Sequence, residues 1–467
     1  MELFFLQRNI CRKQMLLIFK DFMDNHRLDK YILIIAQLAL VIGTIALSEN
    51  DKNLFLYFYL IACCLCILNI KYLLYIFYSS IWISIKLWFD LGGIVIRASD
   101  ISFVFILISF IINSFYLKSF KVQLPKWSDY SILGFILLSI YSFLTSLNKY
   151  GTIIEVIQIF QLIFLYYILL SLVREDKDIK AFMVITIIFG LMDSLWVFNS
   201  IIEHGVGKRY IGILQKTPDE IPYALLFLYL FYLSEKNIFS KLIKLSFLMM
   251  LLLALFFTMG RGLLIIAGVM FFLSTVIYLG SKRQYIKVII SFLSVVLITG
   301  FFISSNQSAT KRYGSIVKGG EHRDLRLYNY YSSFMIMKKY PLTGVGLGND
   351  YEFLKKNLPE FSPEIVRKYG GDSPHNELFH FGIQVGIIGV IYAIFFYSNL
   401  LYKSFYMLLN RSTRTDVIPI AIFASTVGIS LWGLANDIIL AGNGSLVILL
   451  LVFSEMKLNQ RKLSDQF

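Results

Sequence analysis

Long apolar runs recur along the whole sequence, and they constrain its fold more than any other feature. Most of them reach about 18 residues or more, the length that an α-helix needs to cross a hydrocarbon core about 30 Å thick. The chain has 467 residues, of which 57% are hydrophobic and only 16% are charged, too few polar residues for the surface of a soluble protein. We find no run of short alternating strands, the pattern of a membrane barrel. The sequence therefore predicts an all-α polytopic membrane protein.

Fourteen segments qualify as candidate spans, and we expect 12–14 transmembrane helices because two of the segments are weak. The segment 72–89 contains Lys86, and the segment 219–234 is short and carries Pro222. The candidates are 31–47, 53–70, 72–89, 101–117, 130–147, 152–173, 179–202, 219–234, 241–259, 262–279, 286–304, 378–402, 417–434 and 438–456.

Lys and Arg residues gather in alternate connections between these spans. With a cytoplasmic N-terminus, the cytoplasmic segments hold 25 of them and the short outer loops hold 7. Such an asymmetry sets membrane topology, so the net charge of +14 reflects topology rather than nucleic-acid binding. We expect a cytoplasmic basic start (1–30), transmembrane helices (31–304), one extracytoplasmic loop (305–377), further transmembrane helices (378–456) and a cytoplasmic end (457–467).

Two smaller features near the start of the chain have modest explanations. Residues 10–23 fit either an interfacial amphipathic helix or a solvated start. Three of the four cysteines crowd one apolar run as "CCLC", Cys63 to Cys66. No histidine accompanies them, so membrane packing explains them better than metal binding.

The extracytoplasmic loop is long for a segment without structure of its own, and such loops are usually functional. Its 11 Lys and Arg residues outnumber its Asp and Glu residues, which attracts an anionic partner. The stretch "RDLRLYNYYSSFMIMKKY" has helical spacing and is ended by Pro341. Arg323 and Arg326 lie one turn apart on it. They fit either a polyanion site or a salt-bridged solvated helix, since Glu321 and Asp324 are neighbours.

The segment "PLTGVGLGND", Pro341 to Asp350, carries Gly344, Gly346 and Gly348. It is not a dinucleotide-binding loop, because no strand precedes it and its spacing is G-x-G-x-G. Glycines at this spacing form a tight turn with exposed N–H groups. The turn either contacts a phosphate directly or is purely structural.

The segment "HNELFH" contains two histidines, His375 and His380, five residues apart. Two zinc ligands on one helical face need a spacing of four, so we expect no metal here. His380 fits a packed or hydrogen-bonded helix histidine. His375 follows Pro374 and stands beside Asn376, at the outer boundary of the next span. An ordinary imidazole titrates near pH 6.5 and can accept a proton from a hydroxyl. His375 is therefore either a general base or a helix-start residue without a role.

Arg261 stands between two apolar runs in "TMGRG". A charge within the bilayer core costs about 2.5–3.5 kcal/mol, so we expect it at the outer lip. There its guanidinium either grips a phosphate or extends to lipid headgroups. The flanking Gly260 and Gly262 favour phosphate, because they allow close backbone approach.

Three motifs in this order resemble one known family. They are "TMGRG", "RLYNYYSSFMIMKKYPLTGVGLGN" and "SPHNELFHFGIQVGIIG". Residues 255–395 thereby resemble the bacterial O-antigen ligase and O-antigen (capsular polysaccharide) polymerase family, which are inverting C-type membrane glycosyltransferases. The sequence departs from the family pattern at Gly260, where Ser is usual, and at Tyr330, where Trp is common.

The resemblance implies an inverting glycosyltransferase that needs no metal or other cofactor. It implies transfer of a glycan from an undecaprenyl-diphosphate carrier to an acceptor hydroxyl, outside the bacterial cytoplasmic (inner) membrane. His375 would be the base, and Arg261 and Arg326 would bind the diphosphate. Arg326 is preferred to Arg323 because its register to Tyr330 and Pro341 fits the family pattern. Support for the loop would come from Arg323, Gly344, Gly346 and Asn376.

The expected partners are the lipid-linked donor, membrane lipids and an acceptor, but not nucleic acid. The acceptor is lipid A–core for a ligase, or another lipid-linked repeat unit for a polymerase. We favour a polymerase, because the ligase acceptor exists only in some envelopes. The alternative is a transporter, such as a flippase of lipid-linked oligosaccharide. Transporters show repeats and midplane charges. Here the halves show no repeat, Asp193 and Lys86 are the main intramembrane charges, and polar residues gather in one loop.

Overall fold

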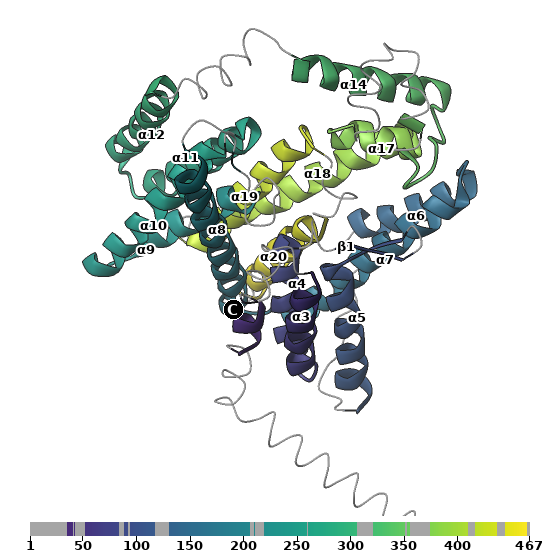
Figure 1. Ribbon diagram of the computed structural model, residues 1–467, viewed down its shortest axis with the longest axis horizontal. Coiled ribbons are helices and arrows are strands. Elements are labelled where there is room, and N and C mark those ends of the chain that lie inside the picture. Colours follow the sequence, from purple (N-terminus) through teal and green to yellow (C-terminus); the bar gives the residue numbers. More distant parts are fainter. Residues whose placement is uncertain are drawn as a thin grey trace, which may run out of the picture. The chain divides into compact units, whose positions relative to one another are not determined.

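The computed structural model describes most of the chain, which divides into two compact units, residues 1–122 and 123–467 (Figure 1). Residues 10–23 and Lys86 lie outside the described residues, so the expectations for them stay predictions. The described residues are 35–40, 42, 52–83, 88–91, 94–116, 130–205, 210, 219–258, 260–305, 321–350, 353–354, 374–409, 416–436 and 444–464.

The first unit is a small helical cluster in which α4 packs against both α3 and α5. The phenol of Tyr59 on α3 donates a hydrogen bond to the carbonyl of Ala98 at the start of α5, over 2.9 Å. Asp100 caps α5, because its Oδ2 accepts from the backbone N–H of Arg97. Its elements are α3 (Lys52–Cys66), α4 (Ile70–Ile83), β1 (Trp88–Leu91), β2 (Ile94–Arg97), α5 (Ala98–Ile111) and the π-helix η1 (Ile112–Tyr116).

A two-stranded antiparallel hairpin interrupts the helices of this unit, with Trp88 paired to Arg97 and Leu91 to Ile94. The expected span 72–89 is therefore wrong at its end, since α4 ends at Ile83 and residues 88–89 belong to β1. Aromatic and β-branched residues make up five of the eight strand positions, and two glycines stand between the strands in the sequence. That composition favours a hairpin.

The second unit consists of helices joined mostly by short connections. Helix α8 packs against α9 and α10, α11 against α19, α18 against α19 and α20, and α7 against α20. Its helices are α6 (Tyr130–Thr145), α7 (Lys149–Leu172), α8 (Asp176–His204), α9 (Glu220–Ser234), α10 (Ile238–Phe257), α11 (Arg261–Ser281), α12 (Tyr285–Ser305), α14 (Glu321–Lys339), α17 (Glu377–Val385), α18 (Ile387–Leu408), α19 (Val417–Gly433) and α20 (Gly444–Ser464).

The predicted fold class, an all-α polytopic membrane protein, is confirmed for the described residues, with the single hairpin as an exception. Five helices are long and apolar enough to cross a membrane, and six shorter apolar helices accompany them. Large apolar side chains of α10 and α12, such as Phe239 and Ile286, are more than 70% exposed. A soluble protein buries such a surface, whereas lipid covers it in a membrane protein. The five long helices are Lys149–Leu172, Asp176–His204, Ile238–Phe257, Gly262–Ser281 and Ile387–Leu408.

The expected span 378–402 is not one helix. It breaks at Gly386, which has a φ of +71°, a left-handed conformation that glycine adopts without strain. The N–H of Ile387 then donates to the carbonyl of Pro341 over 2.8 Å. The short helix α17 is thus separate from α18. Helix α20 differs in the other direction, because it continues beyond the expected end at residue 456 to Ser464.

Lys457 explains why α20 continues past the apolar run. Its Nζ lies 2.6 Å from Oδ1 of Asp176 at the start of α8 and 3.5 Å from Oδ2 of Asp416, which caps α19. A buried cation with two carboxylate partners is compatible with a packed helix. We call this side of the second unit the far end: the starts of α8 and α19, the end of α20, and the α9–α10 turn.

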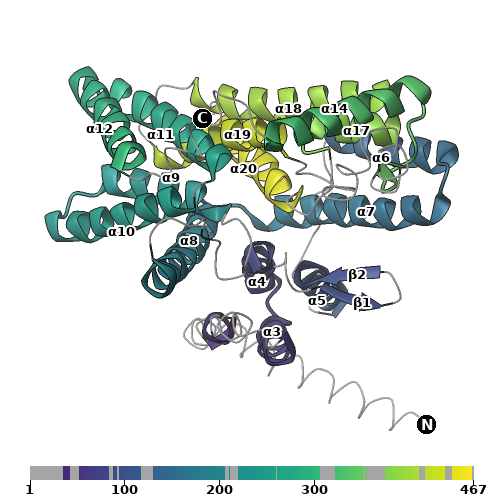
Figure 2. The same cartoon turned by 45° about the horizontal axis from the view of Figure 1, so that its top comes forward.

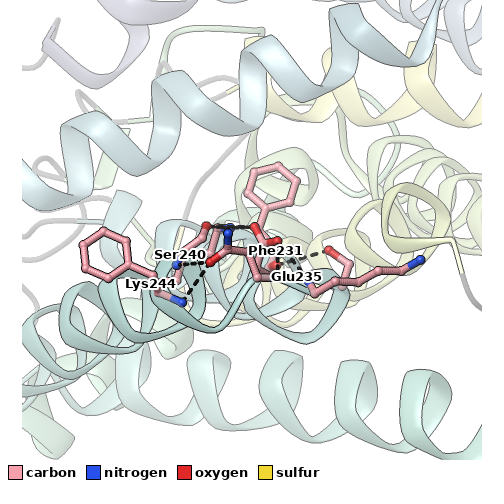
Figure 3. Close-up of polar contacts among 8 residues, drawn as sticks. Phe231, Glu235, Ser240 and Lys244 are labelled. Carbon is pink, nitrogen blue, oxygen red and sulfur yellow. Dashed lines mark hydrogen bonds and ion pairs between the residues drawn. The ribbon is translucent and has the colours of Figure 1, made fainter.

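The α9–α10 turn is organised by one carboxylate, Glu235 (Figure 3). Its Oε2 forms an ion pair with Lys244 and accepts from the Ser240 hydroxyl over 2.8 Å, while Oε1 accepts from the N–H groups of Lys236 and Asn237. The bond from Lys244, together with these hydrogen bonds, lowers the pKa of Glu235 from about 4.5 to about 2.

This lowered pKa predicts how Glu235→Gln changes stability with pH. A carboxyl whose pKa is depressed on folding stabilises the native state above its unfolded pKa and loses that effect as pH falls through its folded pKa. We expect the variant to have a lower Tm in detergent at pH 7. The difference from wild type should shrink between about pH 4.5 and 2. Glu203→Gln, at the exposed end of α8, is the control, and a deficit that does not depend on pH would contradict the prediction.

Candidate active site

The segment Pro341–Asp350, called the glycine segment below, joins α17 through its backbone. The N–H groups of Val345 and Gly346 each donate over 2.9 Å to the carbonyls of Ile383 and Gln384 near the end of α17. Val345 and Ile383 are fully buried in one apolar cluster with Ile336 and Leu354. The glycine segment therefore supports the end of α17 through two backbone hydrogen bonds and shared apolar packing.

The same segment also binds the turn between α6 and α7. The N–H of Leu347 donates to the Ser142 hydroxyl over 2.8 Å, and its carbonyl accepts from the Thr152 hydroxyl over 3.0 Å. Asn349 lies at the centre, because its Nδ2 is 3.0–3.2 Å from Ser146 Oγ, Thr152 Oγ1 and the carbonyls of Asn148 and Val345.

The glycines allow this double attachment. Gly344 and Gly346 have φ values of +60° and +102°. A Cβ at 344 would lie 2.4 Å from the Gln384 carbonyl oxygen, and one at 346 would lie 2.2 Å from Ser146 Oγ. The N–H groups of residues 344–347 all donate within the protein. The geometry is therefore that of a structural turn, and these four groups are already engaged with protein acceptors.

His375 stands immediately before α17 in an unusual backbone conformation. Its φ is +52° and its side chain is half-buried. The next residue, Asn376, caps α17, because its Oδ1 accepts from the N–H groups of Leu378 and Phe379. Its Nδ2 also donates to the carbonyl of Leu434 over 2.9 Å. A left-handed non-glycine residue is strained, and such residues cluster at functional sites.

The last turn of α19 connects His375 with the start of α11. Asn376 bonds the carbonyl of Leu434, and the ring of Trp432 lies against Gly262, where a Cβ would be 2.6 Å from Cζ3. Position 261 is thus brought to the same end of the bundle as His375. We call this the site end. The close packing of Trp432 explains why a glycine is needed at position 262. Gly262 is therefore no sign of a phosphate at this position.

Helix α14 lies beside α17 (Figure 2). Tyr330 stacks on Phe379 with ring centroids 5.1 Å apart, and the sulfur of Met337 approaches Gly382 further along. Both helices run in the same direction here. Position 326 is therefore one turn before Tyr330, toward the start of α17. The side chains of Arg261, Arg323 and Arg326 lie outside what the structure describes, so the roles expected of them stay predictions.

Behind the start of α17 lies a buried polar group of three side chains. Asp350 Oδ2 is 3.1 Å from His380 Nε2, and Gln384 Nε2 donates to Asp350 Oδ1 over 2.8 Å. Burial alone would raise the pKa of Asp350. The charge of His380 and the hydrogen bonds from His380 and Gln384 outweigh it, so the pKa lies below its ordinary value. His380 is the packed, hydrogen-bonded helix histidine that the sequence predicts.

The described geometry can now be compared with known proteins. Residues 245–394 match the family model described as O-antigen ligase. This stretch of 150 residues, about a third of the chain, is similar to O-antigen ligases and is called the O-antigen ligase domain below. This confirms the resemblance drawn from the sequence and indicates a glycosyltransferase-type enzyme of polysaccharide biosynthesis, in a multi-pass membrane protein. A comparison with curated proteins finds no match.

The O-antigen ligase domain contains the starts of α11 and α17, α14 and the glycine segment. Several residues that hold them lie outside it, on the α6–α7 turn and at the end of α19. Sequence reasoning missed Asn349, Asp350, Trp432, Ser146 and Thr152. The adjacent polar pair that ends "GVGLGND" was the available signal for the first two. Nothing local marks the others, because their partners are far away in the chain.

Gly346→Ala tests the attachment of the glycine segment. Alanine at φ +102° is strained and its Cβ meets Ser146, so we expect the free energy of unfolding to fall by roughly 2 kcal/mol or more. The control is Gly268→Ala in α11, where a Cβ meets nothing within 4 Å. Alanine is the better helix former, so this change should be neutral or stabilising by up to about 1 kcal/mol. Equal Tm values for both variants in detergent would contradict the attachment.

Proposed function

We propose that the protein transfers an oligosaccharide from undecaprenyl diphosphate to an acceptor hydroxyl, with inversion at the anomeric carbon. The observation that carries the proposal is the O-antigen ligase domain over residues 245–394, which contains His375, Arg261 and Arg326. Further support comes from the last turn of α19, which contacts both Asn376 and Gly262. Two proposed site segments, 114 residues apart in the chain, therefore share one neighbour.

The proposed donor site lies at the start of α11 and on α14. Arg261 and Arg326 bind the diphosphate, because a guanidinium pairs with phosphate oxygens through two parallel hydrogen bonds. When the bond between the anomeric carbon and the phosphate oxygen breaks, the electron pair stays on undecaprenyl diphosphate. Fixed cations stabilise that charge as it develops. Position 261 also begins α11, where the helix dipole favours an anion.

His375 is the proposed base. The acceptor oxygen attacks the anomeric carbon from the side opposite the leaving diphosphate, and the hydroxyl proton passes to the imidazole. The strained backbone at φ +52° and the Asn376 cap fix where this residue stands. A positioned general base contributes about 10²–10⁴-fold in rate.

The proposed orientation places the far end in the cytoplasm and the site end outside it. The Lys and Arg residues that flank the helices at the far end support this, because positive residues are retained on the cytoplasmic side. They are Arg174, Lys177, Lys180, Lys236, Lys241, Lys244 and Lys457. The site end then meets the donor in the outer leaflet of the inner membrane.

His375→Asn tests the base directly. Asparagine tolerates a left-handed backbone better than most residues, so the variant should fold and insert normally. It lacks an imidazole, so we expect glycan transfer to fall by at least about 100-fold. The substrate is lipid-linked glycan extracted from cells that lack this protein, and the product is resolved by gel electrophoresis. The control is His204→Asn, at an exposed histidine that ends α8. Wild-type activity in His375→Asn would refute the assignment.

The length of surface glycan in a deletion strain tests polymerase against ligase. We propose a polymerase, so deletion should leave acceptors that carry single repeat units. Expression of the wild-type chain should restore long polymers, and expression of His375→Asn should not. Long chains that accumulate on the lipid carrier would instead show that a ligase has been lost.

A further inference from the structure

The buried group Asp350–His380–Gln384 has no step in the proposed transfer. Asp350 is 8% exposed, His380 is 6% exposed and Gln384 is 1% exposed. Removing a carboxylate and its polar partners from water is costly. Because this group is buried, it does not serve to keep the protein surface soluble, and its position indicates a structural role.

The group lies where α17 needs support. Helix α17 has nine residues, too few for a helix to be stable by itself. The break at Gly386 separates it from α18. Its last turn is held by the backbone of Val345 and Gly346, and its first turn is capped by Asn376. The middle of α17 lies between these attachments.

His380 occupies that middle position. Its N–H donates to the carbonyl of Asn376 over 2.9 Å, which closes the first turn of α17, and its ring reaches Asp350 over 3.1 Å. Asp350 ends the glycine segment. It directly follows Asn349, whose side-chain amide is bonded to the α6–α7 turn. A continuous series of contacts thus runs from that turn through Asp350 and His380 to the residue beside His375.

We propose that Asp350 and His380 are positioning residues for the glycosyl transfer. Their 3.1 Å contact, together with Gln384, which lies within 2.8 Å of both side chains, holds the first turn of α17 against the glycine segment and so fixes His375 relative to the bound donor. The inference rests on the proposed function for its catalytic consequence, but not for the attachment itself.

Steady-state kinetics test the catalytic consequence. Asp350→Asn keeps the size of the side chain and removes the charge that holds His380. We expect kcat to fall by about 10- to 100-fold, because a small misplacement of a catalytic group costs this much. The KM for the lipid-linked glycan should stay within about 2-fold of wild type, since Arg261 and Arg326 lie on other helices. A variant with wild-type kcat, or one in which only KM changes, would overturn the proposal.

Two further variants separate positioning from a general loss of folding. The charge swap Asp350→His with His380→Asp restores the pair in reverse, and we expect it to recover at least about half of the lost kcat on a logarithmic scale. The matched control is Glu455→Gln, which breaks the ion pair between Lys403 on α18 and Glu455 on α20. It should leave kcat unchanged. Failure of the swap in protein of normal Tm, or an equal loss of kcat in the control, would count against positioning.

Hydrogen–deuterium exchange tests the attachment without any activity. In Asp350→Asn, peptides that cover α17 should exchange at least about 10-fold faster, while peptides of α18 and α20 keep their wild-type rates. Unchanged exchange in α17 would refute the inference, whatever the kinetics show. If wild-type protein transfers no glycan but α17 exchanges faster in the variant, the proposed function fails and the attachment stands.

Discussion

One side-chain amide holds the site end together. Asn349 Nδ2 lies within 3.2 Å of oxygens from Ser146, Asn148, Thr152 and Val345, and three of these residues are about 200 positions away in the chain. Asn349 is only 2% exposed, and removing a buried hydrogen-bonding group of this kind costs free energy. The glycine segment stays on the α6–α7 turn through this amide, and α17 is bonded in turn to the glycine segment.

The candidate site is therefore held by hydrogen bonds that connect several helices. Backbone hydrogen bonds join the glycine segment to Ile383 and Gln384 of α17. At the other end of α17, the Asn376 amide is bonded to the carbonyl of Leu434, directly after α19. Trp432 in that turn packs on Gly262, beside the start of α11. Rigid support of this kind keeps reacting groups in place at little further cost in entropy.

The sequence predicted the features that depend on local pattern. Apolar runs identified the helices, and three short motifs identified the O-antigen ligase domain. The sequence misjudged the ends of elements where a tertiary partner decides: Pro341 accepts from Ile387 across the break at Gly386, and two carboxylates stabilise α20 beyond its apolar run. The glycines of "TMGRG" and "GVGLG" also suggested ligand contact, yet Gly262 packs on Trp432 and residues 344–347 bind protein acceptors. A glycine that allows close approach does not reveal which group approaches.

The pairing of Lys457 with Asp176 and Asp416 has a consequence for biogenesis. The two carboxylates begin α8 and α19, and their shared cation arrives only with α20, 281 and 41 residues later in the chain. During synthesis, the earlier helices must therefore be inserted before this partner exists. These two contacts form only after residue 457 has emerged from the ribosome, so the starts of α8 and α19 gain their shared partner after both helices have been made.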